Sequence, residues 1–381
     1  MLFLALVTPE TRIALLESRI KAATGDSLLG LEFIGPSELA LLPSPKLDTQ
    51  LLIVEVPPTM EGAARRVTFS DLQVSSSWPD LLRDTGFHLS ARQLTFEPLY
   101  TQPEMEPLTR NTLDTALDSL ELSNLSFDHS IADRISVIPN LRANLLGGQL
   151  SSSVKINPGA NSRTILSSGQ LNKAEASQAL TLLGTKVVPS GYIDLDWSVS
   201  VERPHDSSAP PQIFGEASFR GTDIGISQIN LELELCNAFN RATGRQPAVS
   251  SAIGTPINSL KATQNIDGYR TDITDLQLAL PGLHIRGSGT INRLSQTFEA
   301  RLVTRIGDQF GATVENCGVD SRIASIDWPI RCKGSLNDDP KTWCSVELES
   351  LLRRGLESEL KRRLNDGGVE SLLRSLIPGR T

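Results

Sequence analysis

Apolar and polar residues alternate along the second half of the chain, at residues 275–280 and again at residues 288–306. A period of two sends successive side chains to opposite faces of a strand, so both patterns predict half-buried antiparallel strands. Gly287 and Gly289 interrupt one of these strands, where we expect a bulge or a bend. The residues that we expect on one concave apolar face are Leu276, Leu278, Leu280, Ile285, Ile291, Phe298, Ala300 and Leu302.

Shorter strand-like segments occupy the first half, with Pro and Gly between them. They include residues 28–34, 51–56 and 67–74, and a Pro- and Glu-rich stretch at 101–112 reads as a surface loop. The chain is therefore predicted to be mainly β with a few helices.

Three segments show helical spacing of their apolar residues: Pro9 to Thr24, Asn172 to Leu183 and Val346 to Leu364. We expect the first to dock against the first strands and to cover one end of the sheet. The third carries a leucine at nearly every fourth position with basic residues outside. This pattern favours a helix that covers the open end of a sheet. A helix that binds a partner helix and an interfacial membrane helix are the alternatives.

The first seven residues, Met1 to Val7, are all apolar. Seven residues are too few to span a bilayer, which takes about 20. The stretch is either the buried start of an ordinary element or the remnant of a membrane anchor.

Composition and charge narrow the class of protein. The chain has 381 residues, of which 39% are hydrophobic and 21% charged, which is too apolar for general disorder. Its net charge is −8, so it offers no basic surface and no nucleic-acid partner is expected.

The four cysteines, Cys236, Cys317, Cys332 and Cys344, favour disulfides in an oxidising compartment. A zinc site is the rival interpretation, but there is no Cys-x-x-Cys and no nearby His. Four cysteines allow three connectivities. We favour Cys332–Cys344, whose spacing closes a short loop, with Cys236–Cys317 as the other pair, although the sequence leaves the connectivity open.

No motif for catalysis is present: the chain lacks metalloprotease, nucleophile-elbow, phosphate-loop and dinucleotide signatures. His284 falls on the polar face of a strand, where we expect it to be exposed. A calcium site at Asp338 and Asp339 has no repeated Asp spacing to support it. We therefore expect no enzyme activity, no cofactor and no metal.

Several segments resemble the bacterial AsmA family. They are residues 168–172 and 191–195, residues 215–221 continuing to 240, residues 272–294, and the Trp-Pro-Ile-Arg-Cys-Lys-Gly run at 328–334 with Asp339-Pro340 and Trp343-Cys344. The last of these is the most specific, and it is similar to the C-terminal cap of such proteins. The helix at 9–24 and the segment 28–42 resemble the region that follows their membrane anchor.

The resemblance implies an elongated, curved antiparallel β groove, with the N-terminal helix and the C-terminal amphipathic helix as caps. It divides the chain into an N-terminal helix with the first strands (1–60), the N-terminal part of the sheet (61–165), the groove with its cysteine cap (166–345) and the C-terminal helices (346–381). It also implies anchoring in the bacterial inner membrane, a periplasmic location, and the holding or transfer of phospholipids in outer-membrane biogenesis. Outer-membrane assembly proteins are then possible partners.

Two other classes stay open. A periplasmic scaffold with no lipid-conducting role would show the same alternation, because every half-buried sheet has an apolar face. An unrecognised enzyme, such as a glycan hydrolase on a β scaffold, is the third class, but no carboxylate pair stands out.

Overall fold

The protein is described here from a computed structural model. Apart from the single residues Ile13 and Ser18, the structure describes residues 29–56, 64–83, 85–98, 120–159, 162–182, 189–204, 211–227, 230–243, 245–250, 254–307, 309–312, 314–317, 327–336, 338 and 342–346.

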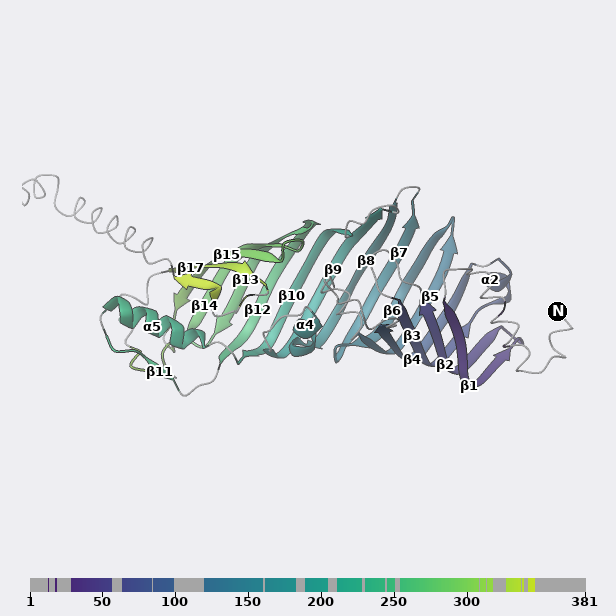
Figure 1. The fold of residues 1–381 in the computed structure, drawn as a ribbon, viewed down its shortest axis with the longest axis horizontal. Helices are drawn as coiled ribbons and strands as arrows, with labels where there is room; N and C mark the ends of the chain where they lie inside the picture. Colours follow the sequence, from purple (N-terminus) through teal and green to yellow (C-terminus); the bar gives the residue numbers. More distant parts are fainter. Residues whose placement is uncertain are drawn as a thin grey trace, which may run out of the picture.

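One large antiparallel sheet dominates these residues, with sixteen strands in the order β1 to β10, β12 to β15, β17 and β18 (Figure 1). Its first eight strands are β1 (Gly30–Ala40), β2 (Lys46–Val56), β3 (Arg65–Ser75), β4 (Gly86–Pro98), β5 (Glu121–Ala132), β6 (Ile135–Leu145), β7 (Gly148–Pro158) and β8 (Ser162–Glu175). The other eight are β9 (Pro189–Pro204), β10 (Gln212–Ile226), β12 (Thr255–Gly268), β13 (Arg270–Leu280), β14 (Leu283–Asn292), β15 (Thr297–Ile306), β17 (Trp328–Ser335) and β18 (Cys344–Val346).

The remaining elements are small. Strands β11 (Val249–Ser250) and β16 (Val314–Glu315) form a separate two-stranded sheet. The helices of the described residues are α2 (Trp78–Arg83), α4 (Ala176–Leu182) and α5 (Leu231–Thr243).

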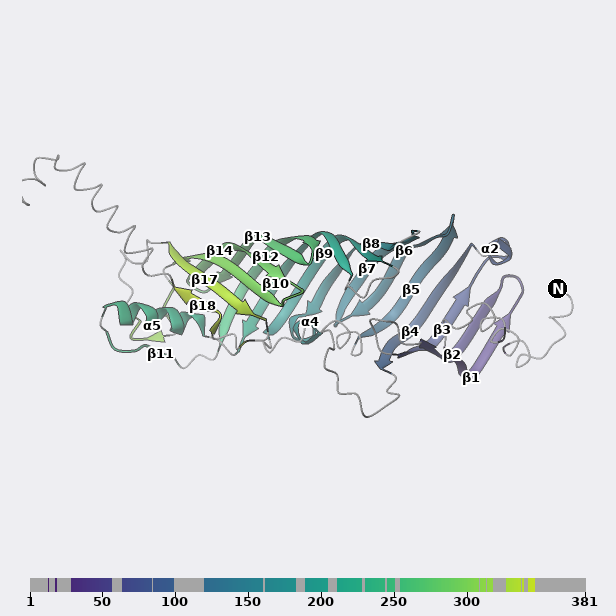
Figure 2. The same ribbon diagram turned by 45° about the horizontal axis from the view of Figure 1, so that its top comes forward.

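Neighbours in the sheet are almost always neighbours in the sequence, so the chain winds as a long meander. The sheet is elongated across its strands, curved, and not closed into a barrel (Figures 1 and 2). The predicted mainly β, curved antiparallel groove is thereby confirmed.

The predicted strands are present, and most are longer than the alternation indicated. Strand β1 runs on to Ala40 because Gly35, with φ of +83°, allows a bulge between Ile34 and Ser37 without ending the pairing with β2. The apolar pattern at 288–306 divides into β14 and β15 at the turn 293–296.

The bulge expected at Gly287 and Gly289 lies on the partner strand. Strand β14 is continuous, and its two glycines face Leu276 and Ile273 of β13, between which the register shifts. A Cβ at Gly287 would lie 2.3 Å from the carbonyl oxygen of Arg301 on β15. The absence of side chains at the two glycines therefore lets the neighbouring strands approach closely.

The helix predicted at 172–183 was wrong at its start. Residues 172–175 continue β8, where Ala174 pairs with Ile193 of β9 and the amide of Lys173 donates to the Asp194 carboxylate at 2.8 Å. These tertiary bonds outweigh helical propensity, and α4 begins only at Ala176. Helix α5 was not predicted, although Asn230 before Leu231 and Leu235 is an N-cap signal.

Several predictions lie outside the described residues: the apolar stretch 1–7, the loop 101–112 and the C-terminal helix beyond Val346, which itself ends β18. Of the helix predicted at 9–24, only Ile13 and Ser18 are described, and both are helical. The expected capping of the sheet by these helices stays a prediction.

Candidate functional site

One face of the large sheet is apolar across its whole width. Residues directly opposite each other in paired strands point to the same face, so a row can be followed from strand to strand. A central row consists of Leu150, Leu171, Leu195, Phe219 and Ala262, on β7, β8, β9, β10 and β12. A row at the N-terminal end consists of Leu52, Phe69, Leu94 and Leu122.

Both ends of this face are filled by packed clusters. The N-terminal cluster is centred on Leu72, Ala91, Leu94, Leu125 and Ala143. The C-terminal cluster includes Leu280, Leu283, Ile285, Trp328 and Ile330, and helix α5 adds Leu235 to it.

The register places all eight predicted groove residues on this one face. Leu278 faces Ile285, Ile291 faces Phe298, and the rows continue through β15 into β17. Six of them, however, belong to the C-terminal cluster or pack against it: Leu278, Leu280, Ile285, Phe298, Ala300 and Leu302. Leu276 and Ile291 are half-buried and lie in none of the packed clusters of the described residues. A lipid-lining role for the eight stays a prediction.

The centre of the apolar face has a different environment. Leu195, Trp197 and Phe219 are half-buried, and among the described residues none of the three belongs to a packed cluster. The Trp197 indole donates a hydrogen bond to the Ser167 hydroxyl at 2.9 Å, which satisfies its polar atom. Leu171 and Ala262 of the central row are buried. The partly exposed apolar area between the two filled ends therefore lies at positions such as Leu195, Trp197 and Phe219.

The opposite face is polar and carries cross-strand ion pairs. Arg220 lies 3.3 Å from Asp196, and Arg331 lies 2.8 Å from Glu299. His284 is exposed there, as predicted. These side chains are well exposed, so their pairs contribute little stability and mainly keep this face solvated.

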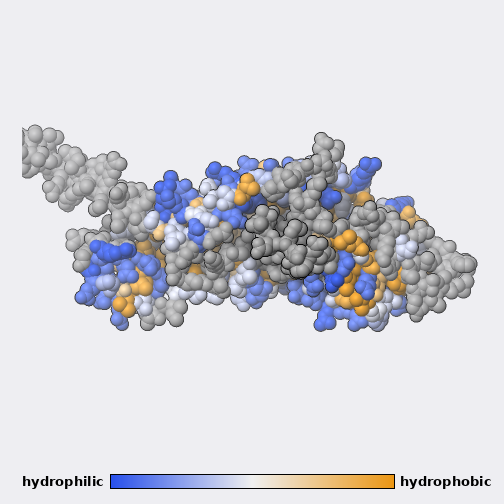
Figure 3. All heavy atoms as spheres, viewed as in Figure 1, coloured by the Kyte–Doolittle hydropathy of each residue, from blue (hydrophilic) through white to orange (hydrophobic). Residues whose placement is uncertain are grey.

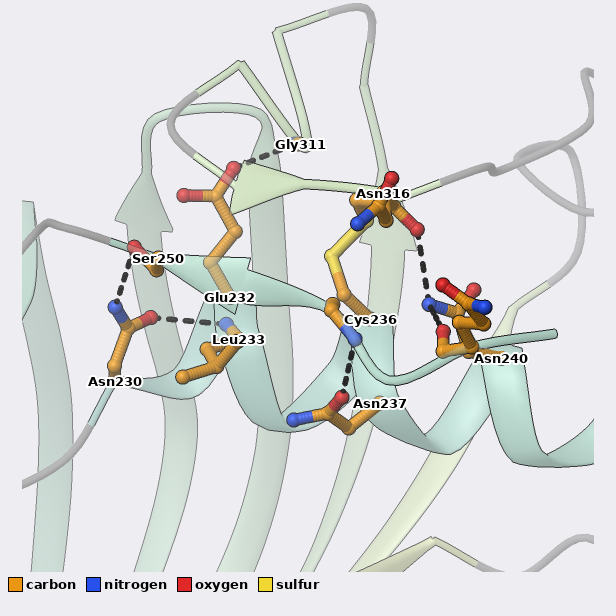
Figure 4. The surroundings of a disulfide bond; sticks show 12 residues. Asn230, Glu232, Leu233, Cys236, Asn237, Asn240, Ser250, Gly311 and Asn316 are labelled. Atoms are coloured by element: carbon orange, nitrogen blue, oxygen red, sulfur yellow. Dashed lines mark hydrogen bonds between the residues drawn. A yellow bond between two sulfur atoms is a disulfide. The ribbon is translucent and has the colours of Figure 1, made fainter.

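A disulfide secures α5 at the C-terminal end of the sheet. Cys236 of α5, fully buried, is bonded to Cys317 just after β16 (Figure 4). Two side-chain amides assist it. Asn240 donates to the carbonyl oxygens of Gln246 and Asn316, at 2.8 and 2.9 Å, and Asn237 accepts from the Ala248 amide.

The second disulfide joins Cys332 of β17 to Cys344 of β18, which lie directly opposite each other. Both predicted pairs are thus confirmed. All four cysteines are engaged in disulfides, which removes them as zinc ligands.

A cavity of about 480 Å³ opens where the ends of β10 and β13 meet the start of α5. Ile226, Leu280 and Leu283 line its apolar side, and Asn230 and Glu232 line its polar side. The Glu232 carboxylate accepts from the Gly311 amide at 2.5 Å, and Asn230 caps α5 through the Leu233 amide at 2.9 Å. The polar groups therefore hold the helix in place.

No group of three or more His, Cys, Asp or Glu side chains is arranged to bind a metal within the described part of the chain. Of the two residues of the candidate calcium site, Asp339 lies outside the described residues, and the Asp338 carboxylate accepts from the Ser335 amide at 2.9 Å, which makes it part of a turn. None of the described helices is long and apolar enough to cross a membrane.

Sequence reasoning missed the central row. Its signal is present in β9, where Ile193, Leu195, Trp197, Val199 and Val201 occupy every second position. The alternation identifies a face in each strand, but the register that joins Leu195 to Phe219 depends on the meander as a whole.

Comparison with protein-family models, with curated proteins and with solved structures gives no match to this chain. The AsmA resemblance therefore rests on the quoted segments alone.

Proposed function

We propose that the chain is an AsmA-like, non-catalytic protein of the bacterial envelope that holds or transfers phospholipids along the apolar groove. The observation that carries the proposal is the continuous apolar face, whose centre at Leu195 and Phe219 is only half-buried. Acyl chains on such a face leave water, which contributes about 0.8 kcal/mol for each CH₂.

The proposed location is the periplasmic side of the inner membrane. The two disulfides support it, because disulfides persist in the oxidising bacterial periplasm. The anchor and any outer-membrane assembly partners follow from the AsmA resemblance and are part of the proposal.

The second candidate is an envelope scaffold that carries no lipid. The C-terminal cluster favours it, since six of the predicted groove residues are packed there against α5 and β17. The two candidate functions differ in what they predict for the centre of the apolar face: the groove holds phospholipid there and the scaffold does not.

Native mass spectrometry of protein purified from bacterial membranes separates them. The wild type should retain phospholipid, and Leu195→Arg should lose it, because the long side chain with its hydrated charge occupies the space that acyl chains would take. Ser198→Arg is the matched control, since Ser198 lies on the polar face of the same strand and is exposed. Wild-type protein that is folded and free of phospholipid would support the scaffold.

A further inference from the structure

Large exposed apolar side chains gather at one corner of the sheet. Leu42, in the turn between β1 and β2, is 79% exposed, and Leu81 and Leu82 of α2 are 50% and 72% exposed. Ile131, near the end of β5, is 38% exposed. We call Leu42, Leu81, Leu82 and Ile131 the apolar corner. Single exposed leucines are ordinary, but a group of them on adjoining turns indicates an interaction site.

Backbone hydrogen bonds show that these segments adjoin. The Ser76 amide, before α2, donates to the Pro45 carbonyl oxygen at 3.1 Å. The Ile131 amide donates to the Thr85 carbonyl oxygen, after α2, at 2.7 Å. The corner thus lies where β1 and β2, β3 and β4, and β5 and β6 are connected. Helix α2 lies at the N-terminal end of the sheet (Figures 1 and 2).

Helix α2 is held firmly despite its six residues. Its N-terminus has a reciprocal cap, in which the Asp80 amide donates to the Ser77 hydroxyl at 3.2 Å and that hydroxyl donates to the Asp80 carboxylate at 2.5 Å. Thr85 also donates to Asp80, at 3.0 Å. These bonds lower the pKa of Asp80, with the Ser77 bond as the main cause. The two leucines are therefore presented by a fixed turn.

The apolar corner continues into the apolar face of the sheet. Val74, Leu89 and Phe127 face one another on β3, β4 and β5 and pack against the N-terminal cluster. Phe87, one pleat nearer to α2, contacts Phe127 edge to face, with ring centroids 6.3 Å apart. Figure 3 shows hydrophobic residues gathered over this N-terminal end of the sheet.

The corner carries exposed charges of both signs. They include Asp80 and Arg83 on α2 and Asp133 and Arg134 in the turn after β5. Asp128 on β5, whose side chain is 55% exposed, adds a carboxylate, so the rim offers no basic cluster to an anionic partner. Trp78, half-buried at the start of α2, has the amphipathic ring that is enriched at membrane–water interfaces.

We propose that the apolar corner inserts into the interfacial layer of a lipid bilayer. The exposed apolar side chains, the amphipathic ring of Trp78 and the continuity with the apolar face together fit lipid as the partner. Insertion sets the N-terminal end of the sheet, with its packed cluster, against the membrane. Lipid delivery to the groove rests on the proposed function, whereas insertion itself does not.

The test places an environment-sensitive fluorophore on the full chain at Leu82→Cys and, as a matched control, at Leu294→Cys. Leu294 is 63% exposed in the turn between β14 and β15, at the other end of the sheet. With vesicles of phosphatidylcholine, the label at 82 should shift to the blue and be quenched by nitroxide lipid, and the label at 294 should not. Flotation should show the variant with Leu81→Ser and Leu82→Ser binding at least roughly tenfold more weakly than Leu294→Ser.

A label at 82 that stays in water on these vesicles overturns the inference, and so does binding that requires phosphatidylglycerol and ignores the leucine changes. The two proposals fail separately. Phospholipid retained by the wild type with a solvated label at 82 refutes only the corner. An inserted label at 82 with no retained phospholipid refutes only the groove.

Discussion

Leu195 of β9 lies directly opposite Phe219 of β10, and neither side chain joins the packed clusters of the described residues. The pair marks the part of the apolar face that its neighbours leave half-buried. Its position between two filled ends divides the sheet into regions that should respond differently to substitution.

An arginine substitution in the C-terminal cluster should destabilise the protein more than one at the centre of the apolar face. Leu283 is fully buried in the C-terminal cluster, so Leu283→Arg buries an unpaired charge and should cost about 3–5 kcal/mol of unfolding free energy. Leu195→Arg should cost about 1 kcal/mol or less, because the long side chain can carry its charge to water. Urea unfolding followed by circular dichroism measures both. Equal losses would mean that the centre is a close-packed core.

The disulfides should differ in their ease of reduction. Cys344 is exposed, whereas Cys236 is fully buried beneath α5. Mild thiol treatment followed by mass mapping should open Cys332–Cys344 first. Reduction of Cys236–Cys317 first would show that α5 opens readily and would contradict the described packing.

Removal of the disulfide that closes the longer loop should lower the stability of the protein more. The Cys236–Cys317 bond spans 81 residues and Cys332–Cys344 spans 12. In the chain-entropy model these contribute about 4.5 and about 3 kcal/mol. Thermal unfolding of the two double serine variants should follow that order, and the reverse order would exclude loop entropy as the main term.

Gly169 should resist substitution because its strand approaches β7 and Trp197 closely. An added Cβ would lie 2.5 Å from the Ser151 carbonyl oxygen and 2.7 Å from the Trp197 ring. Gly169→Ala should therefore cost about 1–3 kcal/mol through overpacking. Gly307→Ala is the control, since its nearest neighbour would be 3.7 Å away. Equal losses of thermal stability in the two variants would contradict the close approach of the strands at Gly169.

Sequence reasoning recovered the elements whose signals are local. The alternation around Leu278 and Leu302 indicated one shared face, and the loop closed by Cys332 and Cys344 indicated their pairing; both are found. It failed at Asn172, where pairing with neighbouring strands outweighs helical spacing, and it missed the capped helix after Asn230.

The packing of that face was not predictable. Leu302 and Phe219 are both half-buried. Leu302 packs against the cluster that β17 and α5 help to form, which the fold alone brings together, whereas Phe219 joins no packed cluster of the described residues. The apolar–polar alternation is the same in β10 and β15. It indicates on which face of the sheet a side chain lies, but not what packs over that face.

A photoreactive residue at 219 tests the groove most directly. Irradiated in bacterial cells, folded protein carrying it should form phospholipid adducts, whereas the same residue at 218 should not, because Ser218 lies on the opposite face of β10. Phospholipid adducts from 219 alone are the result expected for a lipid-holding groove. No adduct from 219, or equal adducts from 218 and 219, would contradict it.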